Sequence, residues 1–286
     1  MNFKKKIYWA FSIIKSGFTL RDSFILTIYF LLWPLRRTVL KKMVLFGEVL
    51  VQNEGGVFFC GKKFSAVSCV NPLFEKNLQS VFKCIKKGNF IDIGSNVGKY
   101  TIMMGNRLKD SKIISIEPEI NNFEFLKKSI YLNQLKNISL FNLACSSRKG
   151  ERNFFIEKEG IGMHSFYQNK LKSNIFIKVK TEKLDNLIFK KLNKNEIKKI
   201  SLIKIDVEGA ELSVLEGANK FIEINSNLKI AVCTYHKQED EKILSNYLTK
   251  QGFEISTSNG YMIFQLDNDQ KPPYLRRGLI RASKIA

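Results

Sequence analysis

Cysteine and proline are scarce in this chain of 286 residues, which has five of each. None of the cysteines forms a Cys-x-x-Cys pair, so the sequence predicts neither a zinc site nor a disulfide framework. A reducing compartment is the simpler interpretation of such cysteines. Histidine is rarer still, with two residues in the whole chain, so each histidine is a candidate for chemistry.

Long hydrophobic runs are also lacking. The apolar run Ser23–Leu35 has 13 residues, whereas a membrane-spanning helix needs about 18–20. No small residues follow this run as a signal-peptide cleavage site would require. Because Arg21, Arg36 and Arg37 flank the run, it suits a helix lying in an anionic membrane interface. We therefore expect a cytoplasmic protein in peripheral contact with the inner membrane face; a helix packed on the rest of the protein is the alternative.

Acidic residues are few relative to basic ones, and the formal net charge is +21. The excess is uneven, because residues 1–42 carry nine Lys or Arg and one acid, and residues 271–286 carry five and none. A compositional bias of the genome is an alternative explanation for part of this charge. Since basic charge alone is a weak signal, we do not expect a nucleic-acid partner.

Composition and turn signals divide the chain into four parts. Residues 1–42 form a basic amphipathic segment, and residues 43–88 form a small β-rich element with several glycines. Residues 89–266 form the main domain. Residues 267–286 form a basic C-terminal tail, either amphipathic or solvated and frayed.

The most informative stretch is Phe90–Thr101, which reads Phe-Ile-Asp-Ile-Gly-Ser-Asn-Val-Gly-Lys-Tyr-Thr. Its apolar residues lead into an Asp-x-Gly-x-x-x-Gly turn, and a buried strand that ends in glycines lets the backbone approach a ligand. A second apolar strand, Lys112–Pro118, is closed by Glu117, whose carboxylate can accept hydrogen bonds from a ribose diol. The alternative is a tight strand-to-helix turn with an incidental acid.

The glycine turn does not match the motifs of dinucleotide-binding or Walker-type nucleotide sites. Asn96 occupies the place of the middle glycine of a dinucleotide motif and Lys99 that of the last, and no Walker Gly-Lys-Ser/Thr closes the turn. Asp-x-Gly-x-Asn-x-Gly instead resembles the first motif of class I S-adenosylmethionine-dependent methyltransferases. This resemblance implies a binding site for S-adenosyl-L-methionine made of Asp92, Gly94, Ser95, Asn96, Gly98, Glu117, Pro118, Cys145 and Asp206.

Strands and helices alternate along the main domain. We expect five strands at Phe90–Ile93, Lys112–Pro118, Ile138–Ala144, Ser201–Asp206 and Leu228–Tyr235. The short segments Phe253–Ser256 and Tyr261–Leu266 flank Asn259-Gly260, which is a hairpin signal. The pattern predicts a Rossmann-like, doubly wound α/β sheet with an antiparallel C-terminal edge hairpin, preceded by an N-terminal extension of helix and β structure. One helix should bury Ile120, Phe123, Leu126 and Ile130, and a later one Leu212, Leu215, Ala218 and Ile222.

Several segments together resemble the FkbM-type methyltransferase family, and the likeness spans roughly residues 44–266. The matching segments are Ile91–Gly98, Ile116–Pro118, Thr181–Asp185, Lys204–Glu211 and Cys233–Lys237. The resemblance implies O-methylation of a sugar hydroxyl in a glycan or glycolipid precursor, as in polysaccharide biosynthesis. An RNA or DNA methyltransferase, or a non-catalytic cofactor-binding protein at a membrane surface, are the alternatives.

The chemistry points to the ends of the last two parallel strands. Methyl transfer is an in-line displacement that depends on positioning, and a sugar hydroxyl reacts better with a base beside it. Asp206, Glu208 and His236 are the candidate catalytic residues, because ligands lie at the carboxyl ends of parallel strands. The alternatives are a helix N-cap for Asp206, first-turn helix chemistry for Glu211 and a surface position for His236.

Two further features stay open. Asp206 and Glu208 could hold Mg²⁺ at an acceptor diol, but nothing in their spacing requires a metal, and none is predicted. His164 lies in a glycine-containing loop between candidate strands Asn153–Glu157 and Ile175–Thr181. That loop is either a lid or a plain hairpin insertion.

Overall fold

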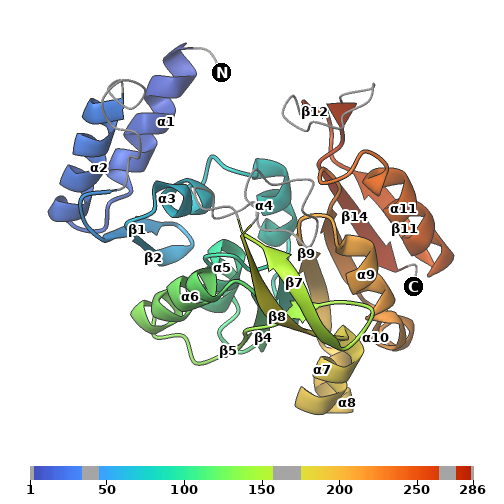
Figure 1. The fold of residues 1–286 in the computed structure, drawn as a ribbon. Helices are drawn as coiled ribbons and strands as arrows, with labels where there is room; N and C mark the ends of the chain where they lie inside the picture. The colour runs from blue at the N-terminus through green and yellow to red at the C-terminus, as the bar shows by residue number, and fades with distance from the viewer. Residues whose placement is uncertain (1–2, 34–44, 157–174, 264–274, 285–286) are drawn as a thin grey trace.

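The computed structural model describes residues 3–33, 45–156, 175–263 and 275–284, and its centre is a seven-stranded sheet (Figure 1). The strand order is β11-β14-β10-β9-β3-β4-β5. These strands are β3 (Asn89–Ile93), β4 (Ile113–Ile116), β5 (Ile138–Phe141), β9 (Ile200–Ile205), β10 (Lys229–Cys233), β11 (Phe253–Thr257) and β14 (Leu279–Lys284). Five neighbouring strands, from β10 to β5, are parallel, and β14 runs antiparallel to both of its neighbours. The Rossmann-like sheet with an antiparallel edge is confirmed.

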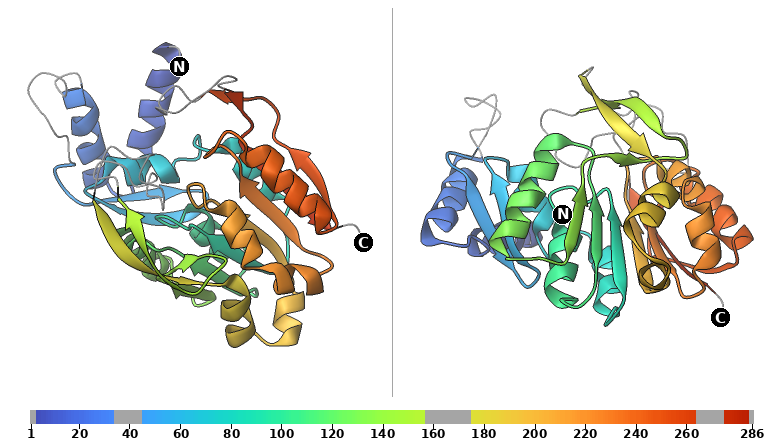
Figure 2. Two further views of the ribbon diagram at one scale, coloured as in Figure 1. Left: turned by 45° about the vertical axis from the view of Figure 1, so that its right-hand side comes forward. Right: turned by 90° about the horizontal axis from the view of Figure 1, so that it is seen from below.

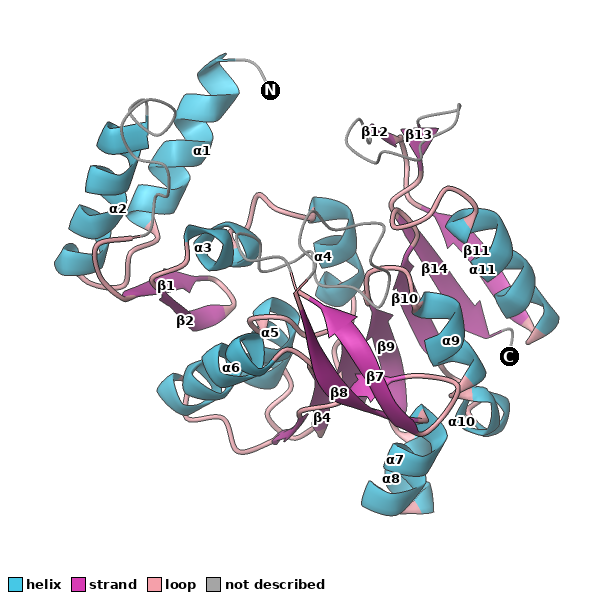
Figure 3. Cartoon of the chain, in the orientation of Figure 1, coloured by secondary structure: helices cyan, strands magenta, loops and turns pink. Residues whose placement is uncertain are grey.

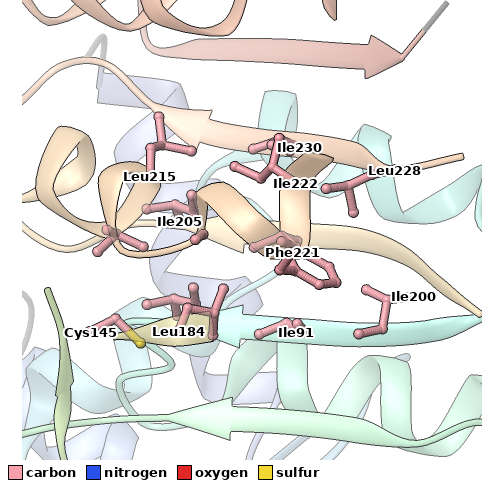
Figure 4. Packing of buried hydrophobic residues seen from close by; sticks show 14 of the residues in the cluster. Ile91, Cys145, Leu184, Ile200, Ile205, Leu215, Phe221, Ile222, Leu228 and Ile230 are labelled. Atoms are coloured by element: carbon pink, nitrogen blue, oxygen red, sulfur yellow. The ribbon is translucent and has the colours of Figure 1, made fainter. Parts of the chain in front are cut away.

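The central strands are apolar on both sides because helices cover both faces of the sheet. Every residue of β3 is buried, and its side chains alternate between two clusters: Ile91 and Ile93 belong to one, Phe90 to the other. Figure 4 shows the first cluster, in which Phe221 and Leu215 pack over the strands. Near-continuous hydrophobic strands of this kind are typical of parallel sheets buried on both faces.

The helices divide between the two faces. One face packs against α7 (Leu184–Lys191), α8 (Lys194–Lys198), α9 (Glu211–Glu216), α10 (Asn219–Ile224) and α11 (Asp240–Lys250). The other face packs against α4 (Lys76–Lys83) and α5 (Lys99–Arg107). The single helix expected to bury Leu215 and Ile222 is two helices, α9 and α10, and both side chains are buried as predicted.

The helix after β4, α6 (Ile120–Leu132), is rotated relative to our prediction. Leu126 is fully buried, whereas Ile120 is 47% exposed. The reason is that polar side chains of this helix face β2 (Gly56–Gly61): Ser129 accepts a hydrogen bond from the backbone N–H of Phe59. Asn133, just past the helix, accepts one from the N–H of Val57 in the same way. These bonds satisfy strand N–H groups that the hydrophobic pattern alone does not account for.

The N-terminal part is a helical hairpin resting on a β-hairpin (Figure 2). It comprises α1 (Phe3–Lys15), α2 (Leu20–Leu32), β1 (Val49–Asn53), β2 and α3 (Phe64–Val70). Ile25, Leu26 and Tyr29 of α2 lie in one core cluster with Val51 and Phe58. Ile25 belongs to the apolar run that was expected to lie in a membrane interface, and for this side chain the expectation is wrong, because it is buried in the protein.

Two segments of this region also differ from the sequence prediction. The element at 43–88 is β-rich only in its first half, since α3 and α4 form the second. The N-terminal extension was expected to contain helix, but α1 was not predicted as a separate helix; it packs against α2 and carries the core residue Ile13.

The C-terminal segment is part of the sheet, so the prediction of a basic tail at 267–286 is wrong. β14 lies between β10 and β11, with Leu279, Ile280 and Ala282 buried. The predicted hairpin is wrong as well, because β11 pairs with β14, and β12 (Met262–Ile263) pairs with β13 (Leu275–Arg276) instead. The sequence analysis missed this strand because its apolar residues lie among basic ones. In the sheet, β14 separates β10 from β11.

A small second sheet crosses the carboxyl end of the main one (Figure 3). It consists of β6 (Ala144–Cys145), β7 (Gly150–Phe155) and β8 (Phe176–Glu182). The expected strands at 153–157 and 175–181 are confirmed, since β7 and β8 pair antiparallel. His164 and its loop lie outside the described residues.

Candidate active site

A cavity lies at the carboxyl ends of β3, β4 and β9, where a ligand binds in an open α/β sheet. Its wall combines the loop after β3, the turn after β9 and the segment between α3 and α4. Seven of the predicted cofactor residues line it: Gly94, Ser95, Asn96, Glu117, Pro118, Cys145 and Asp206.

The glycine loop is shaped by close contacts within the protein. Gly94 has a φ of +76°, and a Cβ atom at this position would lie 1.9 Å from the backbone oxygen of Asp206. Only glycine therefore lets the ends of β3 and β9 approach this closely. Asn96 also has a positive φ, which asparagine tolerates better than most residues, and its Oδ1 accepts a hydrogen bond from Val97.

Two of the predicted cofactor residues support the loop from beneath. Asp92 is fully buried, and its carboxylate accepts a hydrogen bond from Thr101 and pairs with Lys204 at 3.1 Å. Lys204 also donates to the backbone oxygen of Gly94 at 2.7 Å. Gly98, with a φ of +92°, is the N-cap of α5 and packs closely on Leu126. Asp92 and Gly98 thus hold the loop in shape.

Lys204 was part of the family motif but had no predicted role. Burial would lower the pKa of this ammonium group, but Asp92 and then Asp206 raise it above its usual value. The lysine is therefore charged and bridges β9 to the glycine loop. A lone lysine in the apolar run Ile200–Ile205 is the sequence signal that could have identified it.

Glu117 lies in the cavity with both carboxylate oxygens held by backbone donors. Oε2 accepts from Asn96 at 2.7 Å, and Oε1 accepts from Glu119 at 2.9 Å. Burial raises the pKa of Glu117 to about 7, although these two hydrogen bonds oppose the shift. Each oxygen has a second lone pair, so the fixed carboxylate can still accept hydrogen bonds from a ligand diol.

The wall beside Glu117 is largely apolar. It contains Pro118, Leu143 and Phe154 together with Cys145. Burial raises the pKa of Cys145 to about 12, so this thiol is neutral and behaves as a small apolar group. The wall suits a flat aromatic ring.

The three candidate catalytic residues come together at the end of the cavity formed by β9 and β10. His236 Nε2 lies 3.4 Å from Asp206 Oδ1 and 3.5 Å from Glu208 Oε2. The predicted alternative of a surface histidine is wrong, because the His236 side chain is 3% exposed. Glu208 has a φ of +55° and precedes Gly209 in a tight turn, which directs its carboxylate back to the cavity.

Glu211 has a role that helix chemistry alone did not predict. Its Oε1 lies 2.8 Å from His236 Nδ1, and the same oxygen accepts hydrogen bonds from the backbone N–H groups of Val207 and Gly209. Burial would lower the pKa of His236, but Glu208 and Glu211 raise it well above its usual value. Glu211 thus orients the imidazole and fixes the turn that carries Glu208.

The fourth side of the cavity was not predicted at all. Glu75 accepts a hydrogen bond from the Tyr100 hydroxyl at 2.9 Å, and burial raises the pKa of its carboxyl group. Lys99 donates to the backbone oxygen of Phe74 at 2.6 Å, and burial lowers its pKa to about 8. On the β10 side, the Tyr235 hydroxyl donates to Asp206. No spacing in the sequence connects Glu75 with Asp206, because only the fold brings the α3–α4 segment over the sheet.

Among curated proteins, "Methyltransferase 1" of Beauveria bassiana (strain ARSEF 2860) is 22% identical over 212 residues, which cover 68% of this chain and 80% of that protein. "Methyltransferase sdnD" of Sordaria araneosa is 20% identical over 233 residues, which cover 72% and 89%. Among solved structures, the precorrin-6y C5,15-methyltransferase of Geobacter metallireducens GS-15 aligns with a TM-score of 0.45 and 10% identity, over 73% of this chain and 87% of that one.

The family assignment rests on a match to the model of a domain family. Residues 92–255 match the family described as "Methyltransferase FkbM domain", from the aspartate of the glycine loop to the middle of β11. This range is more than half of the chain and contains the cavity residues of β3, β4, β6 and β9. The protein belongs to the FkbM family of methyltransferases, and its cofactor is S-adenosylmethionine.

Proposed function

We propose that this methyltransferase transfers the methyl group to a hydroxyl of a sugar in a glycan or glycolipid precursor. The described residues fit the cofactor: Glu117 offers a fixed carboxylate to a ribose diol, and the Pro118–Leu143 wall suits the adenine ring. Bound S-adenosylmethionine supplies an electrophilic methyl group on a positively charged sulfur. Carboxylates at the Asp206 end favour that positive charge.

One observation carries the proposal of a sugar acceptor: besides Glu117, three further carboxylates line the cavity. Glu75, Asp206 and Glu208 come from separate segments and all face the same space. Carboxyl oxygens accept hydrogen bonds, so they match the donating hydroxyls of a polyol. The same charges would repel the phosphates of a nucleic acid, which disfavours the alternative of RNA or DNA.

Asp206 is the residue we assign to the proton of the reacting hydroxyl. It lies at the cavity wall, accepts a hydrogen bond from Tyr235 and is 3.4 Å from His236. Glu208 holds a neighbouring hydroxyl, and His236 lies beside both carboxylates. Holding the acceptor oxygen near the methyl carbon contributes more than the base itself, as in other reactions that depend on positioning.

A panel of acceptors tests the proposal directly. Purified protein with S-adenosylmethionine is offered sugars, lipid-linked sugars, RNA and DNA, and S-adenosylhomocysteine formation is measured. We expect turnover only with a sugar, together with the loss of one methyl group, 14 mass units, from a glycan of cells that lack the protein. Turnover with RNA or DNA alone would overturn the proposal.

We also propose that the enzyme meets its acceptor at an anionic membrane surface on the cytoplasmic side. In the part of the chain that the structure describes, no helix is both long enough and apolar enough to cross a bilayer. Leu20, Phe24 and Leu31 of α2 are 92%, 65% and 67% exposed, and their spacing places them on one face of the helix. Exposed lysines of α1, such as Lys5 and Lys6, add positive charge nearby. Arg36 and Arg37, which flank the apolar run in the sequence, lie outside the described residues.

A further inference from the structure

We propose that Asp206, Glu208 and His236 bind a divalent first-row transition-metal ion whose open coordination positions face the cavity. The three ligand atoms come from the end of β9, the turn after it and the end of β10. They lie within 4.8 Å of one another.

The distances around His236 distinguish one contact that orients the ring, at Nδ1, from two contacts at Nε2 that suit metal ligands. Nδ1 lies 2.8 Å from Glu211, which is the length of a charge-assisted hydrogen bond. Nε2 lies 3.4 Å from Asp206 and 3.5 Å from Glu208, which is longer than such bonds. An ion about 2.1 Å from a nitrogen and an oxygen ligand keeps those two atoms about 3.4 Å apart in tetrahedral geometry. Both longer distances therefore match two ligands of a shared ion.

The position of Glu211 supports the same assignment. Histidine ligands of metals usually donate the other ring N–H to a carboxylate, which fixes the tautomer and aims the free nitrogen at the ion. The Glu211 side chain is 1% exposed and is held by the N–H groups of Val207 and Gly209, so its contact with Nδ1 is rigid. Nε2 is thereby directed at Asp206 and Glu208.

Charge and ligand type indicate the kind of ion. Three carboxylates, of Asp206, Glu208 and Glu211, surround one imidazole, and a divalent cation would balance them better than a single proton. Mg²⁺ and Ca²⁺ prefer oxygen ligands alone, whereas a mixed set of imidazole and carboxylates suits Mn²⁺, Fe²⁺ or Zn²⁺. Three protein ligands leave at least one position for another group.

A second cluster, Glu211, His236 and Asp240, satisfies the same distance limit but is less suitable. Glu211 Oε1 is already used by two backbone donors and Nδ1, and Asp240 accepts a hydrogen bond from the N–H of Lys237 at 2.6 Å. All three residues of this second cluster are buried, whereas Asp206 and Glu208 line the cavity. Only the first cluster can share its ion with a ligand there.

An ion at this position would bring the reacting hydroxyl and its neighbour on the sugar to fixed sites beside Asp206. This role rests on the proposed sugar acceptor, but metal binding itself does not. The two are therefore tested by separate measurements.

The test is a Mn²⁺ titration of the metal-free full-length protein followed by electron paramagnetic resonance. We expect one Mn²⁺ per chain, weaker binding of Mg²⁺, and at least tenfold weaker Mn²⁺ binding in Glu208→Gln. Glu211→Gln should weaken binding about 10–100-fold through the histidine. Glu239→Gln, an exposed carboxylate three residues from His236, should bind as the wild type does. S-adenosylhomocysteine affinity, measured on each variant, shows that the fold is intact.

Absence of stoichiometric Mn²⁺ binding by the wild type would overturn the site. Unchanged binding in Glu208→Gln with loss in Asp240→Asn would also overturn it, because the ion would then lie in the buried cluster. Mn²⁺ binding without turnover on any sugar would refute the proposed acceptor and leave the metal site supported.

Discussion

The two ends of the cavity are built in different ways. The cofactor end depends on backbone: positive φ angles at Gly94 and Asn96, and backbone N–H groups that hold Glu117. The acceptor end depends on side-chain charges from distant segments, with Asp206 and His236 thirty residues apart and Glu75 still farther away. The comparison teaches that one end is specified by a local motif, whereas the other exists only once the sheet has formed.

The largest effect is expected where the two ends touch. Gly94→Ala places a Cβ 1.9 Å from the Asp206 backbone oxygen, so β3 and β9 must move apart. We expect the free energy of unfolding to fall by roughly 3 kcal/mol or more and cofactor binding to be lost. Gly260→Ala is the matched control, because its φ is +78° but nothing lies within 4 Å of the added atom. Denaturant unfolding should show a loss of only about 1–2 kcal/mol there; equal losses would contradict the contact as the cause.

The second prediction separates the ends by function. Asp206→Asn should lower kcat by about 10²–10⁴-fold, because the acceptor end loses its proton acceptor. Affinity for S-adenosylhomocysteine, measured by calorimetry, should stay within a few-fold of the wild type, since Glu117 and the glycine loop are unchanged. A large loss of cofactor affinity with normal kcat would assign Asp206 to the cofactor end instead.

The third prediction addresses the cofactor end alone. Glu117→Gln puts an amide NH₂ opposite the N–H of Asn96 or Glu119, and it removes the charge that holds the ribose. Affinity for S-adenosylhomocysteine should fall about tenfold to hundredfold, equal to about 1.5–3 kcal/mol. The control is Glu124→Gln on α6, which keeps the same change of side chain away from the cavity. If both variants bind equally well, Glu117 does not contact the cofactor.

The pH dependence sharpens the same assignment. With the pKa of Glu117 raised to about 7, cofactor binding requires loss of a proton below that pH. Calorimetry should show that the affinity for S-adenosylhomocysteine falls by up to about tenfold for each pH unit below 7. Above about pH 7 the affinity should be constant. Between the usual 4.5 and about 7 the folded protein keeps a proton that the unfolded chain has lost, so the free energy of unfolding without cofactor should fall as the pH rises. In Glu117→Gln both dependences should be reduced.

The smallest effect is expected for the exposed face of α2 formed by Leu20, Phe24 and Leu31, which belongs to neither end of the cavity. Deleting residues 1–42 would strip core residues such as Leu26, so point variants are the better probe. Replacing Leu20, Phe24 and Leu31 by Gln should weaken binding to anionic liposomes about tenfold, since apolar burial contributes about 25 cal/mol per Å². The control is Ile243→Gln on α11, which is 44% exposed. Flotation that is unchanged in the triple variant would exclude this face.

Much of the fold could be predicted because its signals are local. Apolar runs ending at Ile93, Ile116 and Ile205 identified buried parallel strands, and the order of strands and helices identified the sheet. β14 was not predicted because its few apolar residues lie among basic ones. They are recognisable as a strand only when β10 and β11 are in place on either side of it. The α6 face was misplaced for a similar reason, since Ser129 and Asn133 are explained by the N–H groups of β2.

The sequence by itself determined the family, the cofactor loop and the residues at the strand ends, because glycine spacing and continuous apolar runs are properties of neighbouring residues. The tertiary structure alone decided that His236 is buried against Glu211, that Lys204 supports Gly94, and that Glu75 faces Asp206. These contacts depend on how strands far apart in the chain are ordered and how their ends align. A charged side chain acquires its partners, and with them its pKa, only when burial and distance are set by that packing.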